Sequence, residues 1–122
     1  EMTISDGLSI DPTQIRLLSK SLSKAESISK LKVFGLSNCK AFPECAEPLS
    51  VLIERCSSLR RIDLSGNFFD EKSLRSLAAV IQKSCPHLEY LKIGSNQMSS
   101  SLMIDLIRAF NRNNMSFILD LT

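Results

Sequence analysis

A nine-residue frame recurs along the chain at nearly constant spacing, and no other feature limits the possible folds as strongly. It reads LRRIDLSGN at residues 59–67, LEYLKIGSN at 88–96 and LKVFGLSNC at 31–39. Each copy has apolar residues at its first, fourth and sixth positions and asparagine or cysteine at its ninth. Recurrence at a period of this length predicts a solenoid, in which each repeat packs on the next.

The sixth residue of the frame serves as an anchor for the whole register. The predicted anchors are Leu8, Leu36, Leu64, Ile93 and Leu121, at successive steps of 28, 28, 29 and 28 residues. Apolar residues also recur 10, 13 and 17 positions after the anchors, a spacing that places them on one helical face. These residues are Ala46, Leu49 and Ile53, then Leu74, Leu77 and Ile81, then Met103, Leu106 and Phe110. Each repeat therefore predicts a short strand, a turn and a helix.

Residues at the expected helix ends agree with this register. Asp70 and the serines at 99–101 precede apolar helical segments, and their side-chain oxygens can accept bonds from free N–H groups of a first helical turn. Proline follows Asp11 directly, at a position where a missing N–H costs little.

The frame and its helical half resemble the leucine-rich repeat family. A repeat of 28 to 29 residues is similar to the ribonuclease-inhibitor-like subfamily, and CPHLEYLKI at 85–93 is similar to the cysteine-containing repeats of F-box substrate adaptors. The resemblance implies an α/β solenoid of about four repeats plus a terminal strand, with parallel strands on a concave face and helices on a convex face. The first repeat departs from the pattern, because Asp6 and Asp11 occupy its apolar and asparagine positions.

We expect residues 1–122 to form a single leucine-rich repeat domain that belongs to a larger protein. The chain starts at Glu1 and stops within an apolar run, so other domains of the same chain are expected partners.

The ninth position of each frame is predicted to turn inward and bind backbone groups. It is occupied by Asp11, Cys39, Asn67 and Asn96. A carboxamide both donates and accepts hydrogen bonds, so it can connect successive turns.

Composition excludes several classes of function. The formal net charge is only +2, which gives no bulk attraction to nucleic acid or an anionic membrane. No apolar run reaches the roughly 18 to 20 residues of a membrane span.

Four cysteines without CxxC spacing argue against a disulfide scaffold or a zinc site and favour an intracellular location, cytoplasmic or nuclear. Cys56 and Cys85 occupy corresponding turns and are expected to be neighbouring buried thiols, with a redox pair as the alternative.

No motif for catalysis or for a cofactor is present. His87 is the sole histidine and is expected to be an exposed turn residue. The chain contains neither a GxxxxGK[ST] loop nor an HExxH pair. We therefore expect no enzymatic activity, no cofactor and no bound metal.

Strand residues between the inward apolar positions should face a partner, because side chains alternate along a strand. They form three rows: Val33, Arg61, Tyr90 and Ile118; Gly35, Asp63, Lys92 and Asp120; Ser37, Ser65, Gly94 and Thr122. Tyrosine and arginine are enriched in interface hot spots, so the first row is the predicted contact surface. The alternating charges of the second row are expected to pair across strands and can also contact the partner. The predicted binding residues are Val33, Arg61, Asp63, Tyr90, Lys92, Ile118 and Asp120.

A row of cations is predicted along one edge, because Arg55, Lys83 and Arg112 each lie nineteen residues after an anchor. Cations at helix C-termini are stabilised by the helix dipole, which explains the row without a ligand, although an acidic or phosphate-bearing partner would also use it.

The function that the sequence favours is non-enzymatic recognition of a protein partner within a larger regulatory or scaffolding protein. The alternatives are the substrate-recognition repeats of an F-box-type ubiquitin-ligase adaptor and a GTPase-activating repeat domain. Neither alternative has a discriminating feature in these residues: an F-box segment is not present, and the near-neutral charge does not favour GTPase activation.

Overall fold

The chain forms one parallel five-stranded sheet with a helix after each of its first four strands. The computed structural model describes residues 2–5, 12–23, 29–110 and 118–122. The strands are β1 (Met2–Ser5), β2 (Val33–Ser37), β3 (Arg61–Asp63), β4 (Tyr90–Lys92) and β5 (Ile118–Asp120). The helices are α1 (Pro12–Ser23), α2 (Ala46–Glu54), α3 (Glu71–Ser84) and α4 (Ser100–Phe110), with the short 3-10 turn η2 (Pro43–Cys45) before α2.

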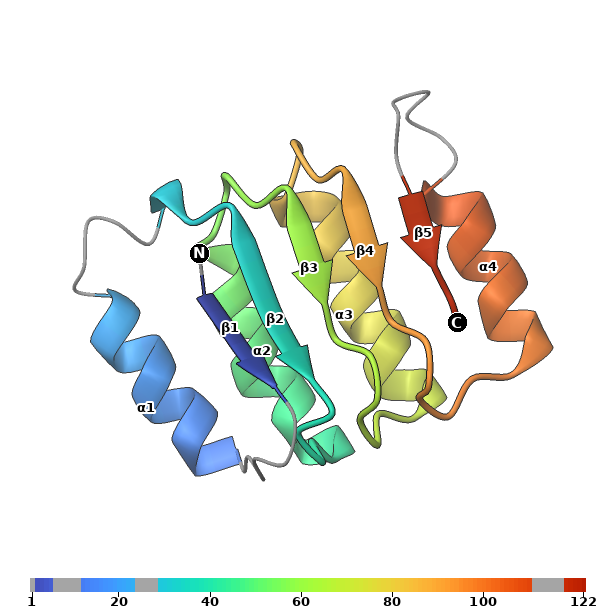
Figure 1. The fold of residues 1–122 in the computed structure, drawn as a ribbon, viewed down its shortest axis with the longest axis horizontal. Coiled ribbons are helices and arrows are strands. Elements are labelled where there is room, and N and C mark those ends of the chain that lie inside the picture. The colour runs from blue at the N-terminus through green and yellow to red at the C-terminus, as the bar shows by residue number, and fades with distance from the viewer. Residues whose placement is uncertain (1, 6–11, 24–28, 111–117) are drawn as a thin grey trace.

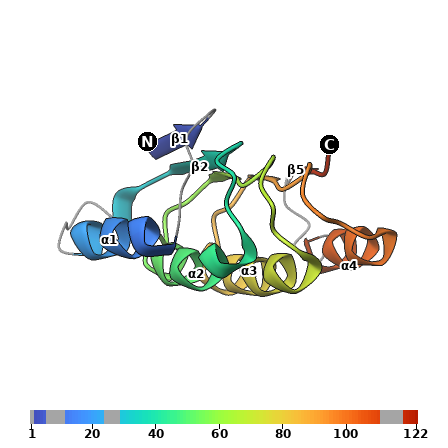
Figure 2. The same cartoon turned by 90° about the horizontal axis from the view of Figure 1, so that it is seen from below.

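Strands follow one another in the sheet in chain order, β1-β2-β3-β4-β5, and every neighbouring pair is parallel (Figure 1). All four helices lie on one side of the sheet, so the molecule has a strand layer and a helix layer (Figure 2). A parallel pair requires a crossover connection, and a helix supplies it in each unit. This arrangement is the α/β solenoid of parallel strands and helices that the resemblance implied.

The register of the last four strands is the one predicted from the anchors. Phe34 lies opposite Ile62, Ile62 opposite Leu91, and Leu91 opposite Leu119. The first three of these side chains are buried beneath the strand layer, as their place in the repeating frame requires. The alignment of these four frames is therefore confirmed.

The first unit differs from its predicted register. Ile4 of β1 lies opposite Leu36, the place that the constant period assigned to Leu8. Leu8 itself is outside the described residues, as are Asp6 and Asp11. The alternating segment MTIS pairs with β2 here, so the step from Ile4 to Leu36 is longer than the other steps.

The core lies between the two layers and is built from the inward strand residues and one face of each helix. The predicted helical positions Leu49, Ile53, Leu74, Leu77 and Ile81 are all buried. In α4 the prediction was wrong at one position: Leu102 is buried and Met103 only half-buried. Leu102 lies one turn before Leu106, and the two share the buried face with Phe110.

Two helices begin at the predicted caps. Asp70 accepts a hydrogen bond from the Ser73 N–H at 2.9 Å, and the Ser99 hydroxyl accepts one from the Leu102 N–H at 3.1 Å. These bonds satisfy N–H groups that have no partner within the helix. The bond from Ser73 is also the main reason that the pKa of Asp70 is lowered.

Asparagine side chains connect successive turns as predicted. The Asn67 amide nitrogen donates to the carbonyl oxygens of Leu36 at 2.6 Å and Leu64 at 3.0 Å, and its Oδ1 accepts from the N–H groups of Cys39 and Ala41, both at 3.1 Å. Asn96 repeats the arrangement one unit later, with its nitrogen donating to Leu64 and Ile93. Cys39 occupies the same position without an amide, and its thiol donates to the Ser37 carbonyl at 3.2 Å.

In the turns after β2, β3 and β4, the residue two positions after the anchor has a left-handed backbone conformation. Asn38, Gly66 and Ser95 have φ values of 53°, 69° and 54°. The sequence frame did not identify this requirement, because the residue type differs in every repeat.

All four cysteines are buried, and none of them forms a disulfide with a described residue. The Cys85 sulfur lies 3.9 Å from the Cys56 carbonyl oxygen, so the two residues are neighbours as predicted. Burial raises the pKa of Cys56 to about 11 and that of Cys85 to about 12. These values favour the packing interpretation over a reactive redox pair, because the thiolate is the reactive species.

Candidate functional site

The first two predicted strand-face rows form continuous lines across the sheet, whereas Ser65 and Gly94 of the third row are buried, contrary to the prediction. Val33 lies opposite Arg61, Arg61 opposite Tyr90, and Tyr90 opposite Ile118. In the second row Gly35, Asp63, Lys92 and Asp120 are paired in the same way. The sheet therefore brings together residues that are about 30 positions apart in the sequence.

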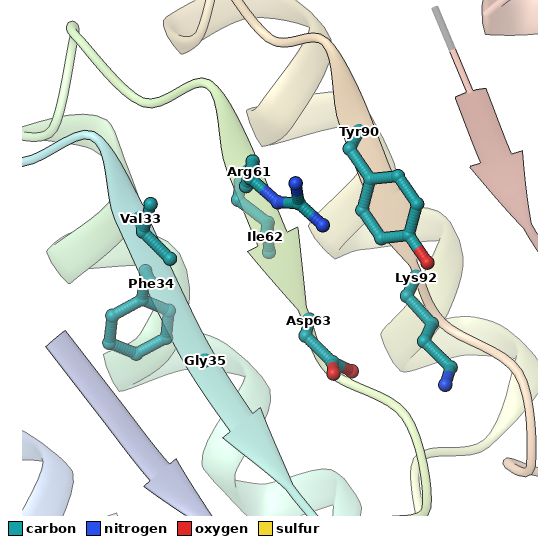
Figure 3. A pocket seen from close by; sticks show the side chains of 8 residues that line it. All are labelled: Val33, Phe34, Gly35, Arg61, Ile62, Asp63, Tyr90 and Lys92. Carbon is teal, nitrogen blue, oxygen red and sulfur yellow. The ribbon is translucent and has the colours of Figure 1, made fainter. Parts of the chain in front are cut away.

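A surface hollow of about 500 Å³ lies in the middle of this face (Figure 3). The residues that line it are Val33, Phe34, Gly35, Arg61, Ile62, Asp63, Tyr90 and Lys92. Gly35 has no side chain at the position where β3 carries Asp63 and β4 carries Lys92, which leaves space beside β3. Phe34 and Ile62 are buried, so the accessible side chains of the hollow are mainly those of the predicted rows.

Arg61 is held against the ring of Tyr90 on the adjacent strand. The guanidinium carbon lies 4.7 Å from the ring centroid, within the range of a cation–π contact. Figure 3 shows the guanidinium directed toward that ring, whereas the Lys92 ammonium points away from it. Arg61 and Tyr90 are thus one stacked pair.

Asp120 of β5 fixes the other end of Tyr90. The Tyr90 hydroxyl donates to Asp120 Oδ2 at 2.9 Å, and this bond is the first cause of the raised pKa of Tyr90. Asp120 also accepts bonds at Oδ1 from the Thr122 hydroxyl at 2.5 Å and the Thr122 N–H at 3.0 Å. The Thr122 bonds, followed by the Tyr90 bond, lower the pKa of Asp120 to about 2.

The expected charge pairs of the second row are not present among the described residues. No ion pair within 4 Å joins Asp63, Lys92 and Asp120. Asp63 instead accepts bonds from the Ser65 N–H at 3.0 Å and the Ser65 hydroxyl at 2.6 Å. Asp63 and Asp120 both accept hydrogen bonds from the residue two positions further along the chain, because those donors lie closer than the Lys92 ammonium on β4. Lys92 makes only a minor contribution to lowering the pKa of Asp120.

Five of the seven predicted binding residues line the hollow, namely Val33, Arg61, Asp63, Tyr90 and Lys92. Ile118 and Asp120 are not among its lining residues. Ile118 is 58% exposed on β5, whereas Asp120 acts on the hollow indirectly by holding Tyr90.

Sequence reasoning missed two surface pairs. Arg60 forms an ion pair with Glu89 at 2.7 Å, one position before the first row. Phe42 and Phe68, in the loops after β2 and β3, have ring centroids 5.1 Å apart and remain about half exposed. The common register would have revealed the first pair, since Arg60 and Glu89 precede corresponding strands. Phe42 and Phe68 do not occupy corresponding positions, so the register gave no signal for them.

The helix layer and the turns carry the remaining candidates. Arg55 and Lys83 are exposed at the C-terminal ends of α2 and α3, as predicted, and Arg112 lies outside the described residues. His87 is exposed, as predicted. Within the part of the chain that the structure describes, no group of three or more His, Cys, Asp or Glu side chains could hold a metal ion, and no helix is long and apolar enough to cross a membrane.

Comparison with known proteins supports the repeat assignment. A family model described as Leucine Rich Repeat matches residues 58–79, which include β3 and the first part of α3. Among solved structures, the chain is similar to one titled "Leiomodin-1 Actin-Binding Site 2", with a TM-score of 0.73 and 11% sequence identity over 98% of this chain and 69% of that chain. No curated protein sequence matches the chain. At this identity the structural likeness shows a shared fold alone, and together with the family-model match it fits an α/β leucine-rich repeat fold.

Proposed function

We propose that this leucine-rich repeat chain is a protein-recognition module that binds a protein partner on its strand face. The single observation that carries the proposal is the hollow around the Arg61–Tyr90 pair. An arginine and a tyrosine, the residue types that dominate interface hot spots, are stacked there on adjacent strands instead of moving freely in solvent. Side chains that are already ordered lose less entropy when a partner binds.

The chemistry of the strand face also suits a macromolecular partner. A hollow bordered by exposed or half-buried polar and aromatic side chains on a continuous sheet offers a broad contact area, with residues from β2, β3 and β4 contributing to it. The first-row residue Ile118 extends this area onto β5 as an exposed apolar side chain. We include the other domains of a longer protein among the candidate partners.

A defined first ligand is available for the test. The solved structure that shares this fold is titled an actin-binding site, so purified actin is a reasonable ligand to measure alongside proteins captured from cell extract. The binding variant is Arg61→Ala with Tyr90→Ala. A matched control on the helix layer is Lys72→Ala with Ile104→Ala, which also removes one exposed cation and one exposed large side chain.

The proposal predicts that the strand-face variant loses a partner that the wild type and the helix-layer control both retain. Gly35→Val provides a second test, since it fills the hollow while leaving every charge in place. Thermal unfolding of each variant separates loss of the surface from loss of the fold. Equal partner binding by the strand-face variant, the wild type and the control would refute the assignment to this face.

A further inference from the structure

The polar groups in and beside the hollow differ in how many hydrogen-bond partners they have. Asp63 Oδ1 accepts two bonds from Ser65, and both oxygens of Asp120 accept bonds from Tyr90 or Thr122. Arg61 and Lys92, by contrast, form no ion pair with any residue that the structure describes. The charged side chains that line the hollow are two cations and one carboxylate. The hollow therefore presents unused donors and a net positive charge.

Two side-chain contacts that connect three strands hold Arg61 in its orientation. Asp120 on β5 holds the Tyr90 hydroxyl, and the Tyr90 ring on β4 supports the Arg61 guanidinium on β3. The Arg61 guanidinium forms no ion pair with a described residue, so its N–H groups are available to donate to a ligand. A planar fork of this kind matches the two oxygens of a carboxylate.

We propose, building on the proposed strand-face function, that Arg61 is a preorganised receptor for a carboxylate of the partner. The occupant of the hollow is an acidic protein segment that places an Asp or Glu side chain against Arg61. The volume of about 500 Å³ lies within the range of roughly 300 to 1,000 Å³ that is usual for ligand sites. Val33 and the Tyr90 ring provide an apolar border for a neighbouring side chain of that segment. Tyr90 and Asp120 act as positioning residues.

Capped dipeptides test this chemistry without a known partner. The probes are N-acetyl-Phe-Glu-amide, its nearly isosteric Gln analogue and its Lys analogue, in which the second side chain is an anion, a neutral amide and a cation. Each is titrated into the ¹⁵N-labelled chain while backbone amides and the Arg61 side-chain Nε–Hε signal are followed by NMR. We expect the Glu peptide to shift Arg61 and the other hollow residues and to bind roughly tenfold more tightly than the Gln peptide, because a charge-assisted bidentate bond is lost in the latter.

Three variants locate the effect. Arg61→Lys keeps the charge but removes the fork, and it should weaken Glu-peptide binding by roughly tenfold. Tyr90→Phe keeps the ring but removes the bond to Asp120, so the Arg61 side-chain signal should shift and sharpen even without peptide as the side chain becomes more mobile. The matched control Arg60→Lys changes the neighbouring arginine, which pairs with Glu89, and should bind like the wild type.

The outcomes separate this inference from the function on which it rests. Equal affinity for the Glu and Gln peptides, or an unchanged affinity in Arg61→Lys, would overturn the carboxylate receptor. Preferential binding of the Lys peptide in the hollow would also overturn it, yet would support binding at the strand face. Absence of any shift at the hollow with all three peptides overturns the receptor as well, and the partner-binding test with Arg61→Ala and Tyr90→Ala then decides the wider proposal separately.

Discussion

The side chain of Asn67 lies between two successive turns and donates a hydrogen bond to the Leu36 carbonyl oxygen at 2.6 Å, although the two residues are 31 positions apart. Its Oδ1 accepts from the Cys39 and Ala41 N–H groups, so one buried amide connects two repeats in both directions. Such an amide leaves several backbone groups without partners when it is removed.

Asn67→Ala should therefore lower the free energy of unfolding by roughly 1 to 3 kcal/mol. Asn96→Ala should lower the free energy of unfolding by a smaller amount. Asn96 is only partly buried, and its Oδ1 accepts a hydrogen bond from one N–H group, that of Phe69. Urea denaturation followed by circular dichroism measures both values. An unchanged free energy of unfolding in the Asn67→Ala variant would contradict the stabilising role of this amide.

Replacement of Ser95 by glycine should stabilise the protein. Ser95 has a φ of 54°, in the left-handed region that disfavours residues with a Cβ, whereas glycine adopts it without strain. We expect a gain of about 0.5 to 1 kcal/mol, the size usual for relief of such strain after the greater freedom of glycine in the unfolded chain is subtracted.

The reciprocal change at the corresponding turn provides the control. Gly66 has a φ of 69°, and a Cβ added there would overlap the Asn38 side chain. Gly66→Ala should therefore be destabilising in the same urea assay. A stability loss on Ser95→Gly would show that another contact of Ser95 outweighs its backbone strain.

Arg61 and Tyr90 should be energetically coupled in the free protein. Their stacked geometry predicts a coupling free energy of about 0.5 to 1 kcal/mol, the usual size of a cation–π contact at an exposed site. A double-mutant cycle with Arg61→Ala, Tyr90→Ala and both changes together measures it by urea denaturation. A coupling indistinguishable from zero would mean that the stacked arrangement is not maintained in solution.

The Cys56 and Cys85 thiols should be protected in the folded protein. Burial raises their pKa values to about 11 and 12, from an ordinary value of 9.0, so both remain protonated at pH 8. We expect them to react with Ellman's reagent only after urea unfolds the chain. Rapid reaction of these two cysteines in the native state would contradict their burial.

The same shifts predict the direction of a pH effect. Above pH 9 the unfolded chain releases these protons while the folded chain retains them, so the folded state binds more protons and stability falls as pH rises from about 9 through 11. Well below pH 9 both thiols are protonated in the folded and the unfolded chain, so their titration should contribute no pH dependence to stability. Replacing both cysteines by alanine should reduce the alkaline dependence, measured as the urea midpoint between pH 8 and 11.

Asp120 should titrate near pH 2, well below an ordinary aspartate. Its bonds from Thr122 are the larger cause and the bond from Tyr90 the smaller, so Thr122→Val should raise the pKa of Asp120 more than Tyr90→Phe does. Carboxyl ¹³C chemical shifts followed from pH 1.5 to 6 provide the measurement. The reverse order would contradict the relative importance of the turn hydrogen bonds.

Part of the candidate site was predictable because sheet register follows from the repeat. Once Leu36, Leu64 and Ile93 are aligned, the residues two positions apart on each strand must share a face, and Arg61 must lie beside Tyr90. The alignment failed where the local sequence departs from the repeat. Ile4, and not Leu8, lies opposite Leu36, because pairing with β2 depends on the alternating segment and not on a constant period.

The sequence by itself determined the period, the inward residues and the order of the strands, since these follow from burying one apolar face in every unit. Only the tertiary structure decided how the exposed polar groups combine. Asp63 bonds to Ser65 in its own turn instead of to Lys92, Tyr90 bonds to Asp120, and Arg61 stacks on the Tyr90 ring. Apolar burial depends on spacing, which a sequence displays directly. A hydrogen bond depends on distance and angle to within a few tenths of an ångström, and those are set only when the strands and turns are packed together.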